Sequence, residues 1–249
     1  MTTSEKLIKI ADNVQKNVEF GKSQGGGGDP AEAFLDIYLE NGNRQNISYA
    51  FSGDGWTAEM LSKIKHVIKP IETKASDRYA QGVFFRLYRN KKELFDMTEI
   101  CKKFDFSECF TLTGLFHNAC VENLTINASK AQGLRQTFAA GDGGKVNHVT
   151  LTVSEACTDY YQTFYYQSEM TEVRFTDGSV IAANIDFARS VLLSAESYHS
   201  IITHCSKTKA FTLTLPPEAT VRNVFDTKYG SGAWDVITAQ YPNVTIMYS

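Results

Sequence analysis

The stretch from Phe110 to Thr176 repeats itself, and this self-similarity constrains the fold more than any other feature of the chain. Each row of the repeat has a phenylalanine, then a gap that holds Asn, Gly, Asp or Ser, and then a short strand in which apolar and polar residues alternate. One such row cannot bury its own apolar edge, so neighbouring rows have to stack on one another, as in a solenoid. The sequence therefore predicts that Phe116, Phe138 and Phe164 lie one above another in a shared core.

The predicted strands of these rows begin at Leu124, Val149 and Val173, which are 25 and 24 positions apart. Because the spacing varies from row to row, the repeat is irregular. The strands occupy an equivalent place in each row, so we expect short parallel strands that stack into one sheet.

Less regular rows extend the pattern in both directions. Upstream, Phe51 and Phe84 are candidate anchors of earlier rows, and Phe104-Asp105-Phe106 is a candidate strand. Downstream, Ile201-Ile202 leads into the alternating strand Phe211–Leu215. Terminal repeats usually diverge because they have to cover an exposed core edge.

The chain is predicted to have three parts. Residues 1–24 begin with a capping-box pattern, and their apolar residues recur near the 3.5-residue period of a coiled-coil seam. The seam residues are Leu7, Ile10, Val14 and Val18. A Gly-rich linker at 25–30 joins this helix to a body at 31–249, which opens with a strand at 33–39 and ends in a helical cap at about 216–249.

A helix as short as residues 1–24 is marginal in water when it is isolated. We therefore expect it to assemble with copies of itself into a homo-oligomer, with a trimer among the possible states. A helix that docks on the body, or a disordered segment, is the open alternative.

Composition excludes several classes of protein. A net charge of -3 argues against a nucleic-acid binder, which would carry a basic face. No apolar run approaches the roughly 20 residues that a membrane helix needs. The first residues show no signal-peptide pattern, so we expect synthesis and folding in the cytoplasm. The five cysteines are scattered without a C-x-x-C pair, which favours reduced core thiols over a zinc site or disulfides.

Motifs for catalysis, cofactors and metals are weak. Gly141-Asp142-Gly143-Gly144-Lys145 resembles a phosphate loop, but it lacks the leading Gly and the Ser or Thr that would hold magnesium. His199, His204 and Cys205 are close in sequence, but a spacing of five places the two imidazoles on different helix faces. We therefore predict no cofactor, no metal and no catalytic residues.

Aromatic residues are dense between positions 160 and 166. If Phe164 points into the core, some of the neighbouring tyrosines must point outward. Exposed tyrosines give a rigid contact surface for protein or sugar at low entropic cost. The candidate binding residues are Tyr160, Tyr161, Tyr165 and Tyr166. The alternative is a ladder of stacked rings inside the repeat.

The row from Gly114 to Leu124 resembles the BspA-type leucine-rich repeat, whose rows centre on a Met-Phe, a Cys and a following Leu. Later rows depart from this pattern, because residues 140–141 and 167–168 are Ala-Gly and Gln-Ser where the family keeps its Cys. The resemblance implies an α/β solenoid: an irregular leucine-rich repeat of short stacked parallel strands with a helical C-terminal cap and an N-terminal coiled-coil helix.

Residues 1–16 are similar to the start of repeat-bearing structural proteins of tailed phages and prophages from gut Firmicutes. This resemblance implies a virion protein of the tail or fibre, assembled in the host bacterial cytoplasm. Its expected partners are itself, other virion proteins, and a host cell-surface protein or glycan, with no nucleic acid and no membrane insertion.

The leading functional hypothesis is therefore non-enzymatic recognition of a host surface by the repeat face. One alternative is a glycan-cleaving enzyme with a pair of carboxylates in a groove. The candidate carboxylates are Asp105, Glu108, Asp177 and Asp186. Another alternative is a structural spacer without a ligand.

Overall fold

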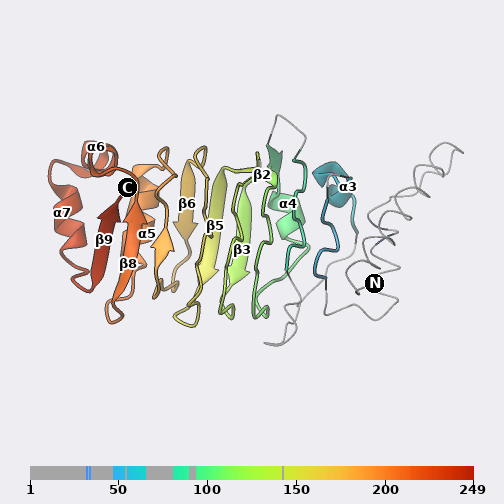
Figure 1. Cartoon of the computed structure of the whole chain (residues 1–249), viewed down its shortest axis with the longest axis horizontal. Helices are drawn as coiled ribbons and strands as arrows, with labels where there is room; N and C mark the ends of the chain where they lie inside the picture. The colour runs from blue at the N-terminus through green and yellow to red at the C-terminus, as the bar shows by residue number, and fades with distance from the viewer. Residues whose placement is uncertain are drawn as a thin grey trace, which may run out of the picture.

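The computed structural model describes residues 32, 34, 47–53, 55–65, 81–89, 94–141 and 143–249. Within them the chain forms an elongated stack of rows that ends in helices α6 and α7 at the C-terminal side (Figure 1). The predicted helix at 1–24, the linker at 25–30 and most of the predicted strand at 33–39 lie outside the described residues. Phe34 of that strand is instead helical and buried. Its ring packs on Phe51 and Trp56, so tertiary packing overrides the local alternation.

The first elements are short. They are α3 (Ala58–Ser62), β1 (Phe95–Asp96), α4 (Thr98–Cys101), β2 (Cys120–Glu122), β3 (Leu124–Ala128), β4 (Lys145–Val146) and β5 (His148–Val153). The later elements include the longer helices. They are β6 (Glu172–Phe175), β7 (Ile185–Asp186), α5 (Ala195–Thr203), β8 (Phe211–Leu215), α6 (Glu218–Tyr229), α7 (Ala233–Thr238) and β9 (Val244–Tyr248).

The described strands form three parallel sheets of three strands each, in the orders β1-β2-β4, β3-β5-β6 and β7-β8-β9. Leu124, Val149 and Val173 are register partners in the second sheet, as the repeat predicts. The sequence predicted that the strand at 211–215 extends the central rows. In the structure the strands at 211–215 and 244–248 belong to the third sheet instead. In Figure 1 the arrows of β8 and β9 run opposite to those of β3, β5 and β6, because the chain reverses direction within each row.

A second ladder links segments of consecutive turns, which we call the turn rows. They lie at 48–51, 81–89, 113–118, 135–138 and 161–166. In each turn row the residue two positions before the phenylalanine has a positive φ. These residues are Tyr49, Gly82, Gly114, Gln136 and Gln162.

Backbone amides in the turn rows donate to the next row at every second residue. Phe116 N–H donates to the Thr137 carbonyl at 2.7 Å, and Phe138 N–H donates to the Thr163 carbonyl at 3.0 Å. The amides between them form turns along the same segment of chain. For example, Leu115 N–H donates to the Leu112 carbonyl at 3.2 Å. The buried backbone is thus satisfied without regular strands. Residues 81–89 form turns and no right-handed helix, because Arg86 and Tyr88 have positive φ.

One phenylalanine from each turn row enters a single column of rings. The column is Phe51, Phe84, Phe116, Phe138, Phe164 and Phe187, with successive centroids 6.3, 5.0, 6.3, 5.3 and 4.6 Å apart and all pairs stacked. The predicted alignment of the three central phenylalanines is therefore confirmed. Phe187, directly after β7, continues the column, whereas Ile201-Ile202 lies within α5.

Helix α5 covers the edge of the β3-β5-β6 sheet. Its N-cap, Ser194, accepts a hydrogen bond from Ser197 N–H at 3.1 Å. The Ser197 hydroxyl accepts from Val173 N–H at 3.0 Å, and the Ser200 hydroxyl accepts from Phe175 N–H at 2.8 Å. Helical side chains thus satisfy two edge amides that would otherwise be open to pairing with another strand.

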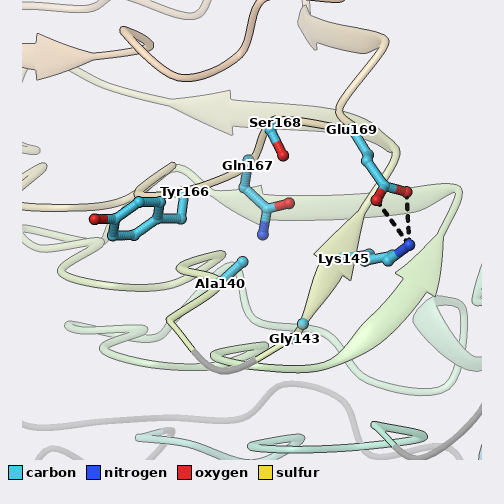
Figure 2. A pocket seen from close by; sticks show the side chains of 8 residues that line it. Ala140, Gly143, Lys145, Tyr166, Gln167, Ser168 and Glu169 are labelled. Carbon is cyan, nitrogen blue, oxygen red and sulfur yellow. Dashed lines mark hydrogen bonds and ion pairs between the residues drawn. The ribbon is translucent and has the colours of Figure 1, made fainter.

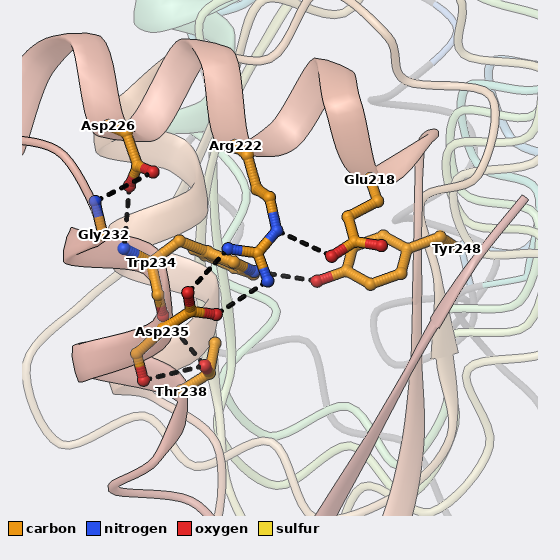
Figure 3. Close-up of polar contacts among 8 residues, drawn as sticks. All are labelled: Glu218, Arg222, Asp226, Gly232, Trp234, Asp235, Thr238 and Tyr248. Atoms are coloured by element: carbon orange, nitrogen blue, oxygen red, sulfur yellow. Dashed lines mark hydrogen bonds and ion pairs between the residues drawn. The ribbon is translucent and has the colours of Figure 1, made fainter.

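The C-terminal helices are joined by a polar network (Figure 3). Arg222 of α6 donates to Glu218 at 2.6 Å and to both carboxylate oxygens of Asp235 on α7, at 2.9 and 2.7 Å. Asp226 accepts from Trp234 N–H at 2.9 Å, which fixes the start of α7. Trp234 is buried, so these contacts hold its ring over the last row of the core.

Candidate functional site

Three of the four predicted binding tyrosines lie on the surface. Tyr161, Tyr165 and Tyr166 are 52%, 39% and 47% exposed, and all three belong to the turn row 161–166. Phe164 of the same row is buried in the ring column. The row therefore exposes three tyrosines because it anchors itself through the one phenylalanine among them.

Tyr160 corrects the prediction, because it is only 2% exposed. It lies four positions before Phe164, and the equivalent residues of the two preceding rows are Leu112 and Leu134, both fully buried. Burial raises the pKa of the Tyr160 hydroxyl. The comparison of rows could have identified Tyr160 as a core residue, which contributes little exposed surface.

A groove of about 470 Å³ runs beside the exposed tyrosines. Its lining combines the turn row 161–166 with strands β7 and β8, which follow later in the chain. The lining residues are Tyr160, Tyr161, Gln162, Tyr165, Asn184, Ile185, Asp186, Thr212 and Thr214. We call this feature the Tyr-Thr groove. Sequence reasoning found its tyrosines and named Asp186 in another context, but it missed Gln162, Asn184 and the two threonines.

Protein contacts orient the amide side chains of the groove. Gln162 Oε1 accepts a hydrogen bond from Gln136 Nε2 at 2.8 Å, so a neighbouring row holds the Gln162 amide. Asn184 Oδ1 accepts from Thr212 N–H at 2.7 Å, which links β7 to β8. In each case the carbonyl oxygen accepts a hydrogen bond from the protein, and the NH₂ group can donate hydrogen bonds to a ligand.

The charged groups near the groove are few. Asp186 Oδ1 accepts from Ala188 N–H at 2.7 Å, and Asp186 is the one carboxylate among the described lining residues. The Arg135 guanidinium lies 4.2 Å from the centre of the Tyr161 ring, a cation–π contact. Arg135 also forms an ion pair with Asp159 at 3.8 Å. One face of Tyr161 is therefore already occupied by a cation.

Tyr165 and Tyr166 form a ridge between two hollows. Their ring centroids are 4.2 Å apart in an edge-on arrangement, and the hydrogen bond that the Tyr165 hydroxyl donates to Tyr166 raises the pKa of Tyr165. Tyr165 lines the Tyr-Thr groove, whereas Tyr166 lines a smaller hollow of about 220 Å³. Arg189 lies 5.6 Å from the Tyr166 ring centre.

The polar groups of the smaller hollow serve the fold (Figure 2). Lys145 pairs with Glu169 at 2.7 Å, which joins successive rows. The buried Gln167 accepts from Val146 N–H at 2.9 Å and donates to the Phe138 carbonyl. Lys145, which ends the segment that resembles a phosphate loop, is thus held by a carboxylate.

The four candidate carboxylates lie in different surroundings. Asp105 accepts from Ser107 N–H at 3.0 Å, and Glu108 pairs with Lys130. Asp177 is exposed just after β6, and Asp186 lines the Tyr-Thr groove. The glycan-cleaving alternative needs two facing carboxylates, and the described lining of this groove supplies one.

The cysteines are free thiols, four of them buried and Cys101 half-buried. Burial raises the pKa of Cys157 and Cys205 to about 12, which is typical of inert core thiols. Over the part of the chain that the structure describes, no group of three or more potential metal ligands occurs and no helix is long and apolar enough to span a bilayer. The predicted oligomerisation residues lie outside that part. They are Leu7, Ile10, Val14 and Val18.

No protein-family model, curated protein or solved structure matches this chain. The candidate site is therefore interpreted from its own geometry.

Proposed function

We propose that this chain is a non-enzymatic recognition protein, an irregular leucine-rich-repeat solenoid that presents the Tyr-Thr groove and its tyrosine ridge to a macromolecule on a host cell surface. The observation that carries the proposal is the exposure of three neighbouring tyrosines beside a groove with oriented amides. Binding surfaces combine rigid aromatic area with a few fixed polar groups in this way.

The rigidity of the site supports this proposal. Phe164 anchors the tyrosine row on both sides, with ring centroids 5.3 Å from Phe138 and 4.6 Å from Phe187. A preorganised surface loses little conformational entropy when it binds, so more of its contact energy appears as affinity. The row that carries the exposed tyrosines is thus held by the core before any partner binds.

The biological setting that we propose is the tail or fibre of a tailed phage that infects gut Firmicutes. Its support is the resemblance of residues 1–16 to such proteins. In this setting the segment 1–24 assembles copies of the chain, and several weak sites act together through avidity.

A cell-binding assay tests recognition directly. Fluorescently labelled full-length protein is incubated with a panel of gut Firmicutes cells, and bound fluorescence is measured. The double variant Tyr165→Ala, Tyr166→Ala should lose adhesion and retain its melting temperature, because both rings are exposed. Tyr229→Ala is the control, since this tyrosine is 42% exposed on α6.

Two results would contradict the proposal. Wild-type protein that adheres to no member of the panel would exclude recognition of these host surfaces. Adhesion that the double variant keeps in full would exclude the tyrosine ridge as the binding surface.

A further inference from the structure

We infer that the ligand of the Tyr-Thr groove is a neutral glycan, an inference that rests on the recognition function proposed above. Three properties of the groove lead to this class: aromatic rings beside it, a mixed set of donors and acceptors along it, and a balance of charge that disfavours ions of either sign.

The aromatic side of the groove suits a sugar ring. Tyr161 and Tyr165 both line the groove and are 52% and 39% exposed. A pyranose ring has an apolar C–H face and a rim of hydroxyl groups, so it can lie against an aromatic ring while its hydroxyls reach polar neighbours. The volume of about 470 Å³ is within the usual range of ligand sites, roughly 300–1,000 Å³.

The hydrogen-bonding groups match the rim of such a ring. Gln162 and Asn184 have engaged carbonyl oxygens and offer NH₂ donors. Asp186 Oδ2 offers an acceptor, because the described contact of this carboxylate uses Oδ1. The Thr212 and Thr214 hydroxyls line the groove and can donate or accept. Sugar hydroxyls also donate and accept at once, so adjacent hydroxyls can satisfy the amide donors and the carboxylate together.

The charges disfavour the other small-ligand classes. A quaternary ammonium ligand would need open aromatic faces, but the Arg135 guanidinium covers one face of Tyr161 at 4.2 Å and would repel it. An anionic ligand would meet the Asp186 carboxylate, and the Arg135 guanidinium beside Tyr161 is already paired with Asp159. The Arg189 guanidinium lies over the ring of Tyr166, which does not line the groove. An uncharged, hydroxyl-rich ligand avoids both penalties.

Calorimetric titration of the full-length protein tests the ligand class. The neutral probes are the hexasaccharides of cellulose, amylose, laminarin and chitin, and the charged probes are hexagalacturonate and the chitosan hexasaccharide. We expect binding to at least one neutral probe and weaker binding to both charged probes. Asp186→Asn should weaken the neutral complex about tenfold, because it removes a charge-assisted hydrogen bond.

Matched variants separate the groove from the rest of the surface. Asp177→Asn makes the same change at an exposed aspartate outside the groove and should leave affinity unchanged. Thr212→Val with Thr214→Val removes both hydroxyls at nearly constant shape and should weaken binding as Asp186→Asn does. Failure of all neutral probes to bind, preference for a charged probe, or equal effects of Asp186→Asn and Asp177→Asn would overturn the inference.

Treatment of the host cells distinguishes the glycan inference from the recognition function on which it rests. Mild periodate cleaves the vicinal diols of 1,4-linked glucans, whereas laminarinase and chitinase digest the 1,3-linked and N-acetylated glycans, whose internal residues lack such diols. One of these three treatments should abolish adhesion, and protease should leave adhesion intact. Adhesion that survives all three glycan treatments and disappears after protease would identify a protein receptor. The proposed recognition of a host surface would then be supported, and the glycan inference would be wrong.

Discussion

The substitution Phe138→Ala tests whether the ring column is the shared core of the molecule. Phe138 is fully buried, and its ring stacks on Phe116 at 6.3 Å and on Phe164 at 5.3 Å. Truncation removes the burial of the ring and both ring contacts, and it leaves a cavity between two rows. The neighbouring rows cannot close this gap freely, because backbone hydrogen bonds fix their separation.

The expected loss follows from these contacts. Burial of a phenylalanine contributes about 2 kcal/mol, and each stacked ring pair adds about 1 kcal/mol. The free energy of unfolding should therefore fall by about 4 kcal/mol, within the range of about 3–5 kcal/mol for Phe→Ala substitutions in cores. For a chain of this length the melting temperature should drop by roughly 6–20 °C.

Urea denaturation followed by tryptophan fluorescence measures this loss. Trp56 and Trp234 are both buried, the first near α3 and the second in the cap, so each reports on a different end of the stack. A single-tryptophan version of the protein for each position shows whether removal of a central ring weakens both ends, as the coupling of neighbouring repeats requires.

Phe85→Ala is the matched control for Phe138→Ala. Phe85 is half-buried next to the column, and its ring contacts His117 instead of another phenylalanine of the column. Its truncation should cost about 1 kcal/mol, the value of an aromatic contact outside the core. A loss for Phe138→Ala no larger than that of the control would refute the idea that the rows share one core.

Two further predictions concern packing and assembly. A Cβ at Gly144 would clash with the Asn118 backbone, so Gly144→Ala should destabilise the protein by about 1–3 kcal/mol in urea melts. Gly141→Ala is the control, because Gly141 has no positive φ and its Cβ would meet nothing closer than 3.9 Å; equal losses would contradict this reasoning. Full-length protein should exceed the monomer mass in light scattering, and deletion of residues 1–24 should reduce it to a monomer; an unchanged mass would remove the coiled-coil hypothesis.

Local patterns in the sequence located many elements correctly. Alternation identified β3, β5, β6 and β8, because side chains of a strand point to opposite faces with a period of two. Thr57 and Ser194 are good N-cap residues and cap α3 and α5, since each hydroxyl accepts an amide hydrogen of the first turn. The predicted helical cap at about 216–249 contains α6, which ends at Tyr229 before Gly230.

Sequence patterns failed where the backbone follows neither the 3.6-residue period of a helix nor the two-residue period of a strand. In the turn rows positive φ recurs at Gln136, Gln162 and other residues, so neither a helical nor a strand pattern describes which side chains point inward. The sequence patterns therefore could not separate the buried Tyr160 from its exposed neighbours. The resemblance to a leucine-rich repeat also gave no reason to expect α5 at the sheet edge.

The sequence by itself determined the central part of the phenylalanine column and the register of the central strands, because both depend on residues that recur once in each row. Only the tertiary structure decided the Tyr-Thr groove. Thr212 and Asn184 approach Tyr161 because β7 and β8 stack after the tyrosine row, although Tyr161 and Thr212 are about fifty positions apart in sequence. Stacking of the rows brings these distant residues to one groove, and no local sequence pattern predicts that they lie together.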